Sequence, residues 1–236
     1  MSVSILELVE KNNAIERQKR ELEMEALQSQ INPHFLYNTL NIIKWMAVRS
    51  KANDIVECII TLGNILQPIY KSSDTMCPLR DEFDYVQNYV RIMNLRFGNG
   101  IILRLDVPDQ LLDYKIPKFI LQPIIENSIT HGYDQTTMDS ITISVVLTEV
   151  GDDIHIEISN NGVSMSVEKL NGLNSKLSNR SAISHNSTQA GIGLFNVNRR
   201  LRTYFGDAYG LYIRNSTEEG TCVLLRISKL IDSNLL

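Results

Sequence analysis

The sequence predicts an α+β protein, in which an all-helical first part precedes a second part of about five strands and three helices. Three observations support this prediction. Apolar residues recur at three-and-four spacing as far as Phe97, which indicates helices. The segment Phe97-Gly-Asn-Gly100 then interrupts the pattern. After this break, apolar and polar residues alternate, as they do along strands.

The composition argues against several classes of protein. The 236 residues are 43% hydrophobic and 21% charged, which is typical of globular rather than disordered chains. A net charge of −4 leaves no cationic surplus for phosphate backbones, so we expect no nucleic-acid partner. Three widely spaced cysteines indicate neither a disulfide framework nor a zinc site. Polar residues interrupt every apolar stretch, so no membrane span is expected.

Residues 4–31 are predicted to form a long polar helix. Residues 4–31 lack glycine and proline and are rich in good helix formers. Leu8, Ile15 and Leu22 recur every seven residues, which is a modest coiled-coil signal. An ordinary solvated helix is the alternative.

A proline then interrupts this helical pattern. Pro33 either begins a new helix, with Asn32 as its cap, or kinks the preceding one. Apolar spacing predicts further helices over about 52–70 and 79–97. Because the connection around residues 49–51 is short, we expect the helices on either side of it to be antiparallel neighbours.

The second part is predicted to alternate strands with helices. We expect strands over 101–107, 141–150, 154–159, 211–215 and 221–228. Helices are expected over 116–130 and 191–206. Residues 171–190 are rich in asparagine and serine and predict a mobile loop, within a mobile lid over 165–190.

The first motif with chemical potential is Gln30-Ile-Asn-Pro-His34-Phe-Leu-Tyr-Asn38. His34 follows a proline break, and imidazole suits reversible proton or phosphoryl transfer near neutral pH. A single helical histidine is, however, more often a structural or surface residue.

Polar residues also interrupt an otherwise apolar helix. Glu126, Asn127, Thr130 and His131 lie within the run from Leu121 to Gly132. Polar groups on such a helix need partners, which either a bound ligand or solvent at the helix edge would supply.

Two glycine-containing segments complete the set. Asn160-Asn161-Gly162 follows a predicted strand, where a plain turn is the simplest interpretation. Gly191-Ile-Gly193 opens a predicted helix, where backbone N–H groups can approach phosphate oxygens. Each of these signals is weak on its own.

Together and in this order, the motifs resemble those of LytS/YesM-type sensor histidine kinases over residues 25–228. The His34 segment matches the phosphoacceptor motif, 121–132 the asparagine box and 191–201 the second glycine box. The resemblance implies a helical dimerisation and phosphoacceptor domain over 1–98. It also implies a GHKL-type (Bergerat) ATP-binding sandwich over 99–236.

The resemblance further implies roles for individual residues. His34 would attack the γ-phosphate of ATP, Glu126 would act as a base or polarise His34, and Asn38 would orient water or the phosphoryl group. Asn127 would coordinate Mg²⁺. The implied ATP-binding positions are Asn127, His131, Gly132, Asn160, Gly162, Gly191, Gly193 and Leu194.

Partners and location are implied in the same way. The resemblance implies a homodimer that passes the phosphoryl group to an aspartate of a response regulator protein. The chain as given is expected to be cytoplasmic. Relatives are usually membrane-anchored, so we interpret it as the cytosolic part of a sensor whose membrane segment is absent from this chain.

The first glycine box departs from the family. Asn160 stands where relatives have an aspartate that bonds the adenine amino group, and Ser164 stands where they have a glycine. The loss of charge assistance predicts about tenfold weaker ATP binding. A degenerate kinase, acting as a dimeric scaffold or phosphotransfer module, is therefore a second hypothesis. A third is a gyrase-like or chaperone-like ATPase, which would have no use for the His34 motif.

Overall fold

The computed structural model describes residues 33–71, 74–178, 192–217 and 220–229. By its internal contacts the chain divides into two compact units, residues 1–63 and 64–236, and each is described by itself. The helix and coiled coil predicted over 4–31 lie outside the described residues. Within the described ranges, no helix is both long and apolar enough to cross a membrane.

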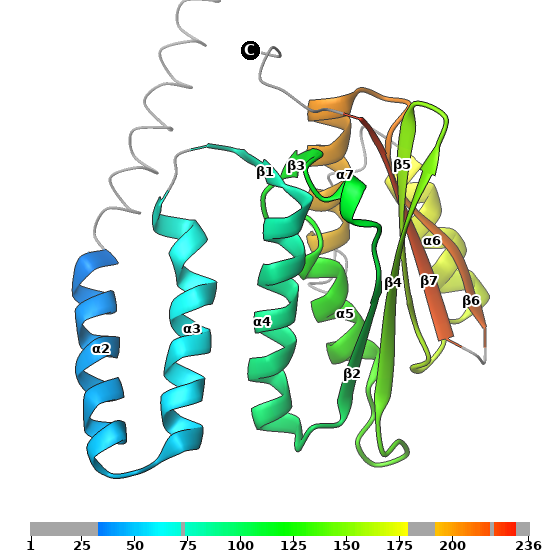
Figure 1. Ribbon diagram of the computed structural model, residues 1–236. Helices are drawn as coiled ribbons and strands as arrows, with labels where there is room; N and C mark the ends of the chain where they lie inside the picture. Colours follow the sequence, from blue (N-terminus) through cyan, green and yellow to red (C-terminus); the bar gives the residue numbers. More distant parts are fainter. Residues whose placement is uncertain (1–32, 72–73, 179–191, 218–219, 230–236) are drawn as a thin grey trace, which may run out of the picture. The chain divides into compact units, whose positions relative to one another are not determined.

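The first unit contains a helical hairpin. Helices α2 (Pro33–Arg49) and α3 (Asn53–Lys71) are joined by a tight turn (Figure 1). Lys51 adopts a left-handed φ of 55° in this turn, and the Ala52 N–H donates to the Ala47 carbonyl over 3.0 Å. The helix predicted over 52–70 is thus confirmed.

This hairpin leaves many large apolar side chains in solvent. Ala47 and Ile59 are buried, but the following side chains are exposed: Tyr37, Ile42, Ile43, Trp45, Met46, Val48, Ile55 and Ile60. Such a collection of exposed apolar groups on two adjacent helices is typical of a surface that contacts another protein.

A short strand and a long helix are the first elements that lie wholly within the second unit. Strand β1 (Met76–Pro78) leads into α4 (Leu79–Phe97), which confirms the predicted helix over 79–97. Gly98 terminates α4 directly after Phe97, because its left-handed φ of 63° allows its N–H to bond the Asn94 carbonyl.

A mixed five-stranded sheet forms one layer of this unit. Its order is β2-β4-β5-β7-β6, and only the β2–β4 pair is parallel. The strands are β2 (Ile101–Asp106), β4 (Ile141–Val150), β5 (Asp153–Asn160), β6 (Gly210–Thr217) and β7 (Gly220–Ser228). The five predicted strands are therefore confirmed.

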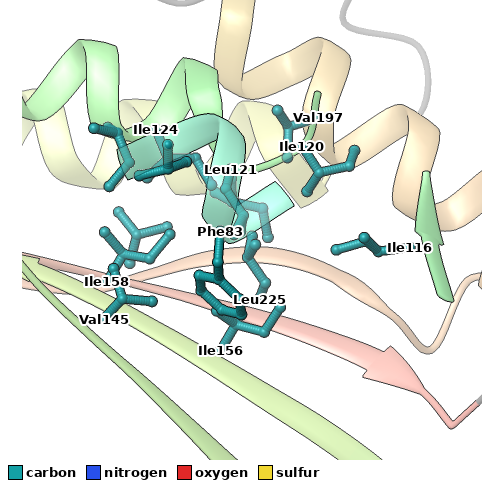
Figure 2. Close-up of a cluster of buried hydrophobic side chains, with 14 of the residues drawn as sticks. Phe83, Ile116, Ile120, Leu121, Ile124, Val145, Ile156, Ile158, Val197 and Leu225 are labelled. Carbon is teal, nitrogen blue, oxygen red and sulfur yellow. The ribbon is translucent and has the colours of Figure 1, made fainter. Parts of the chain in front are cut away.

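Helices form the other layer. Helices α4, α5 (Gln122–Gly132) and α7 (Ile192–Phe205) lie on one side of the sheet (Figure 1), and α6 (Val167–Ser178) packs beside β6. The core lies between the layers, and Figure 2 shows Phe83 of α4 pointing toward Ile156 and Leu225 of the strands. This confirms the predicted α+β arrangement.

Two asparagines cover the outer edges of the sheet. Asn94 of α4 bonds both backbone groups of Ile101 on β2, accepting its N–H at 2.9 Å and donating to its carbonyl at 2.8 Å. Asn174 of α6 does the same to Ile213 on β6, at 3.2 Å and 2.9 Å. Each side chain replaces the hydrogen bonds that a further strand would make.

The helix predicted over 116–130 begins later than expected. Residues 115–117 instead form strand β3 (Lys115–Pro117), which pairs with β1. Phe119 then adopts a left-handed φ of 58°, which a helix cannot accommodate. The apolar pattern alone does not distinguish a short buried strand from the start of a helix.

The mobile loop predicted over 171–190 is wrong for its first part. Residues 171–178 belong to α6. Leu177 is buried, and Leu173 packs against the same core. These two leucines pack a helix against the core, although the polar composition of the segment predicts a loop. The remaining residues, 179–190, lie outside the described part of the chain.

The functional division near residue 98 stays a prediction. By packing, α4 belongs with the sheet, because its apolar side chains lie in the same core as those of α5 and the strands. The boundary between the compact units falls within α3, between residues 63 and 64.

Candidate functional site

Helix α5 carries the predicted asparagine box, and Asn127 faces the start of α7. A Cβ built on Gly193 would lie 3.9 Å from Asn127 Nδ2 and 3.6 Å from Pro123 Cβ. The first turn of α7 therefore approaches the side of α5 that carries Asn127, which is partly buried. Because a helix N-terminus presents free N–H groups, this junction is suited to an anion.

The other end of α5 packs closely on the turn after β5. The Val163 N–H donates to the Gly132 carbonyl over 2.9 Å. A Cβ on Gly162 would lie only 2.2 Å from that carbonyl oxygen, and one on Gly132 would lie 2.8 Å from Asn160 Nδ2. Both glycines are thus needed for the close approach of α5 to this turn.

Asn160 is held in the middle of this arrangement. It is the last residue of β5, is 9% exposed, and pairs with Ile143 on one side and Thr221 on the other. Beside it, Asn161 accepts the Thr142 N–H through Oδ1 at 2.7 Å. The two adjacent asparagines therefore differ in role, because Asn161 is bonded to β4 while Asn160 lies against Gly132.

The predicted site residues Asn127, Gly132, Asn160, Gly162 and Gly193 are thus brought together along α5. They come from α5, the end of β5, the turn after it and the start of α7. Segments distant in the sequence therefore meet along a single helix. Leu194 adjoins them but its side chain is buried in the core, which leaves its backbone for any ligand.

Glu126 points elsewhere on the same helix. Burial raises the pKa of Tyr85 to about 12 and that of Tyr89 to about 12, and the charge of Glu126 contributes to both shifts. The exposed carboxylate of Glu126 therefore lies on the side of α5 that faces α4. Asn127, about 100° further around the helix, lies on the α7 side. His131, in the last turn, is exposed.

The remaining predicted residues lie outside this cluster. His34 lies in the first turn of α2, and Asn38, exposed, follows one turn later. Both belong to the first unit, which is described separately from α5. Gly191 lies outside the described residues.

Sequence reasoning missed three residues that shape the site. Gly220 has a φ of 122°, and a Cβ there would overlap the Asn160 carbonyl oxygen at 1.6 Å. Asn198 of α7 is buried and joins α6 to β6 by donating to Leu177 O and accepting from Leu211 N. Glu82 lies on the apolar stripe of α4, and its charge at a core-facing position was the available signal.

The described residues contain no cluster of three or more histidine, cysteine, aspartate or glutamate side chains that could hold a metal ion. Mg²⁺ does not require such a cluster, because it usually binds one or two protein ligands together with water and substrate phosphates. The carboxamide oxygen of Asn127 is suited to this limited contribution.

Substituting Gly162 with alanine tests the close approach of the turn to α5. We expect Gly162→Ala to lower the free energy of unfolding by about 1–3 kcal/mol, because the new methyl overlaps the Gly132 backbone. Urea denaturation would measure the change. Gly172→Ala is the matched control, because nothing lies within 4 Å of its Cβ position, and an exposed helical alanine should stabilise by about 0.5–1 kcal/mol. Equal effects of both substitutions would contradict the geometry.

Known proteins resemble this chain over nearly its full length. The sensor histidine kinase YesM of Bacillus subtilis is 32% identical over 229 residues, which cover 96% of this chain and 37% of YesM. The sensor protein LytS of Oceanobacillus iheyensis is 33% identical over 205 residues, which cover 86% of this chain and 34% of LytS. The chain thus spans about a third of the length of these relatives.

Solved structures resemble it more distantly. The histidine kinase domain of a blue-light activated kinase from Erythrobacter litoralis matches 84% of this chain and 86% of that chain, with 11% identity and a TM-score of 0.47. The catalytic domain of the histidine kinase ThkA matches 66% of this chain and 95% of that chain, with 13% identity and a TM-score of 0.45.

Two family models match successive parts of the chain. One, described as histidine kinase, matches residues 22–101 and includes α2, α3 and α4. The other, the histidine kinase-, DNA gyrase B- and HSP90-like ATPase, matches residues 113–231 and includes α5, α6 and α7. Because this second match covers half of the chain, the protein belongs to the family of histidine kinase-, DNA gyrase B- and HSP90-like ATPases.

Proposed function

We propose that this chain is the kinase core of a two-component sensor, which phosphorylates His34 from Mg-ATP and passes the phosphoryl group to a response regulator aspartate. The observation that carries the proposal is the junction of Asn127 with the glycine-led start of α7, within a segment that matches the ATPase family. The preceding segment, which holds His34, matches histidine kinases. An ATPase that does not phosphorylate a histidine would not need the segment that matches histidine kinases.

ATP would bind along α5. Free N–H groups in the first turn of α7 would receive phosphate oxygens, favoured by the helix dipole. The Asn127 carboxamide would hold Mg²⁺, which neutralises phosphate charge. Gly132, Asn160 and Gly162 lie at the opposite end of α5, where the packing is close, and they would contact the base. His131, exposed beside them, would line the entrance.

The chemistry would be an in-line phosphoryl transfer. The unprotonated ring nitrogen of His34 attacks the γ-phosphorus, a nitrogen–phosphorus bond forms, and the bond to the bridging oxygen breaks as ADP leaves. The remaining ring proton needs an acceptor, which is the role we propose for Glu126. Asn38, one turn after His34, would orient the phosphoryl group. An aspartate carboxylate of the regulator then takes that group from the imidazole.

The exposed apolar side chains of α2 and α3 support a homodimer. The relatives are sensor proteins, and we propose that anchoring to a membrane occurs through a segment outside this chain. Association through the hairpin would place two copies of His34 in one assembly.

Phosphorylation of His34 tests the proposed function. Incubation with γ-labelled Mg-ATP should give acid-labile, base-stable label on the wild-type chain. His34→Gln should abolish the label and leave nucleotide binding unchanged, because His34 receives the phosphoryl group rather than holding ATP. Label that persists in His34→Gln would contradict the proposal. ATP hydrolysis without any phosphohistidine would instead favour a gyrase-like ATPase.

Asn160 decides between an active and a degenerate kinase. If Asn160 bonds the adenine amino group, Asn160→Asp should bind ATP about tenfold more tightly, because the acceptor becomes charged. Calorimetric titration with Mg-ATP would measure the change. Asn161→Asp is the matched control, because it adds the same charge to a side chain that bonds Thr142. A wild-type chain that binds no ATP and forms no phosphohistidine would support the degenerate scaffold.

Self-association tests the exposed hairpin surface. Light scattering at micromolar concentration should give the mass of a dimer. Met46→Glu should shift the mass toward that of a monomer, because a charge in a buried interface is costly. Trp45, the single tryptophan, is 63% exposed and should report the change by red-shifted fluorescence. Val150→Glu, at an exposed site on β4, should leave the dimer intact, and a monomeric wild type would refute the proposal.

A further inference from the structure

Glu82 is the only charged residue that is buried among the described residues, with 3% of its surface exposed. It lies on the core-facing stripe of α4, between Leu79 and Phe83. An isolated carboxylate is costly to bury, so its partners should explain its position.

The partners of Glu82 are donors from the segment that leads into α5. Its Oε2 accepts the N–H groups of Ile120 and Leu121, both at 2.9 Å. Its Oε1 accepts the N–H of Phe119 and lies 3.8 Å from the thiol sulfur of Cys77, which donates to it. Every neighbour in this set is a donor, so a fully ionised carboxylate satisfies all of them.

These bonds hold the three residues that lead directly into α5. Helix α5 begins at Gln122 after Leu121, which contributes no side-chain cap. The chain approaches it through Phe119, whose left-handed φ of 58° is unfavourable for a residue with a side chain. The ring of Phe119 contacts Tyr85 of α4 edge-on, with centroids 5.2 Å apart. Two residues of α4 thus hold the strained turn before α5.

The distance from this turn to the candidate site is short. Asn127 follows Leu121 by six residues, or about 9 Å of helix. A rigid helix of this length transmits any displacement of its start to Asn127. The same helix contacts the start of α7 at Gly193, so a shift of α5 would also alter that junction.

We propose that Glu82 is a positioning residue of the nucleotide site, which fixes the start of α5 and thereby the placement of Asn127 for Mg-ATP. This inference rests on the proposed function, because it assigns ATP to the α5–α7 junction. It makes α4 a determinant of nucleotide affinity, although α4 precedes the segment that matches the ATPase family.

The test compares three variants of α4 in the full chain. Glu82→Gln keeps the size of the side chain but places an NH₂ group against N–H donors. Glu82→Asp keeps the charge and shortens the reach by one methylene. Asp84→Asn is the matched control, because Asp84 is an exposed carboxylate on the same helix. Mg-ATP affinity is measured by calorimetric titration and local opening by amide hydrogen exchange.

We expect Glu82→Gln to weaken Mg-ATP binding about tenfold, the loss typical of a hydrogen-bonded charge. Amide exchange should accelerate at residues 119–125 and stay unchanged in β4 and β5. Glu82→Asp should give an intermediate affinity, and Asp84→Asn should match the wild type. If Glu82→Gln fails to fold, the Mg-ATP affinity of Glu82→Asp relative to the wild type tests the inference.

Two results would overturn the inference. The first is a wild-type affinity for Mg-ATP in the Glu82 variants. The second is faster amide exchange throughout the sheet together with an unchanged dissociation constant for the folded fraction. That second result would indicate that Glu82 has a merely structural role. A wild-type chain that binds no Mg-ATP would refute the proposed function instead. In that case, faster amide exchange confined to residues 119–125 in Glu82→Gln would still support the conclusion that Glu82 fixes the start of α5.

Discussion

The buried carboxylate of Glu82 joins three parts of the second unit. It belongs to α4, it accepts backbone N–H groups from residues 119–121, and it lies near Arg200 of α7. Burial raises its pKa above the ordinary value, while the three N–H donors and the charge of Arg200 act in the opposite direction. A neutral side chain of this size offers fewer acceptors. The turn before α5, and hence the helix that organises the candidate site, depends on this group.

Asparagine side chains bond unpaired backbone groups elsewhere in the unit, at the edges of the sheet. An exposed sheet edge offers unpaired backbone groups to any other strand, and Asn94 and Asn174 occupy those groups at Ile101 and Ile213. Asn198 similarly bonds Leu211 while it holds the end of α6. These bonds occupy backbone groups of Ile101, Ile213 and Leu211 that would otherwise be open to another strand. Large apolar side chains are exposed on α2 and α3.

The sequence predicted much of the fold because its signals are local. Apolar spacing located α4 at residues 79–97, and alternation located the hairpin of β4 and β5 around Gly151. The start of α5 was wrong by several residues, because β3 pairs with β1, a partner nearly 40 residues away in the sequence. Helix α6 was missed because only three leucines of a polar segment, Leu170, Leu173 and Leu177, reach the core, and no local pattern shows where the core lies.

The same contrast holds for the site. The sequence by itself determined which residue types were available, because the order of the histidine, asparagine and glycine motifs indicated a histidine kinase without reference to coordinates. Only the tertiary structure decided their arrangement. It turned Asn127 toward α7 and Glu126 toward α4, and it brought Gly132 and Gly220 close to Asn160 and Gly162 close to Gly132. A motif gives only the order of residues along the chain. The orientation of their side chains depends on close packing between segments that are distant in the sequence.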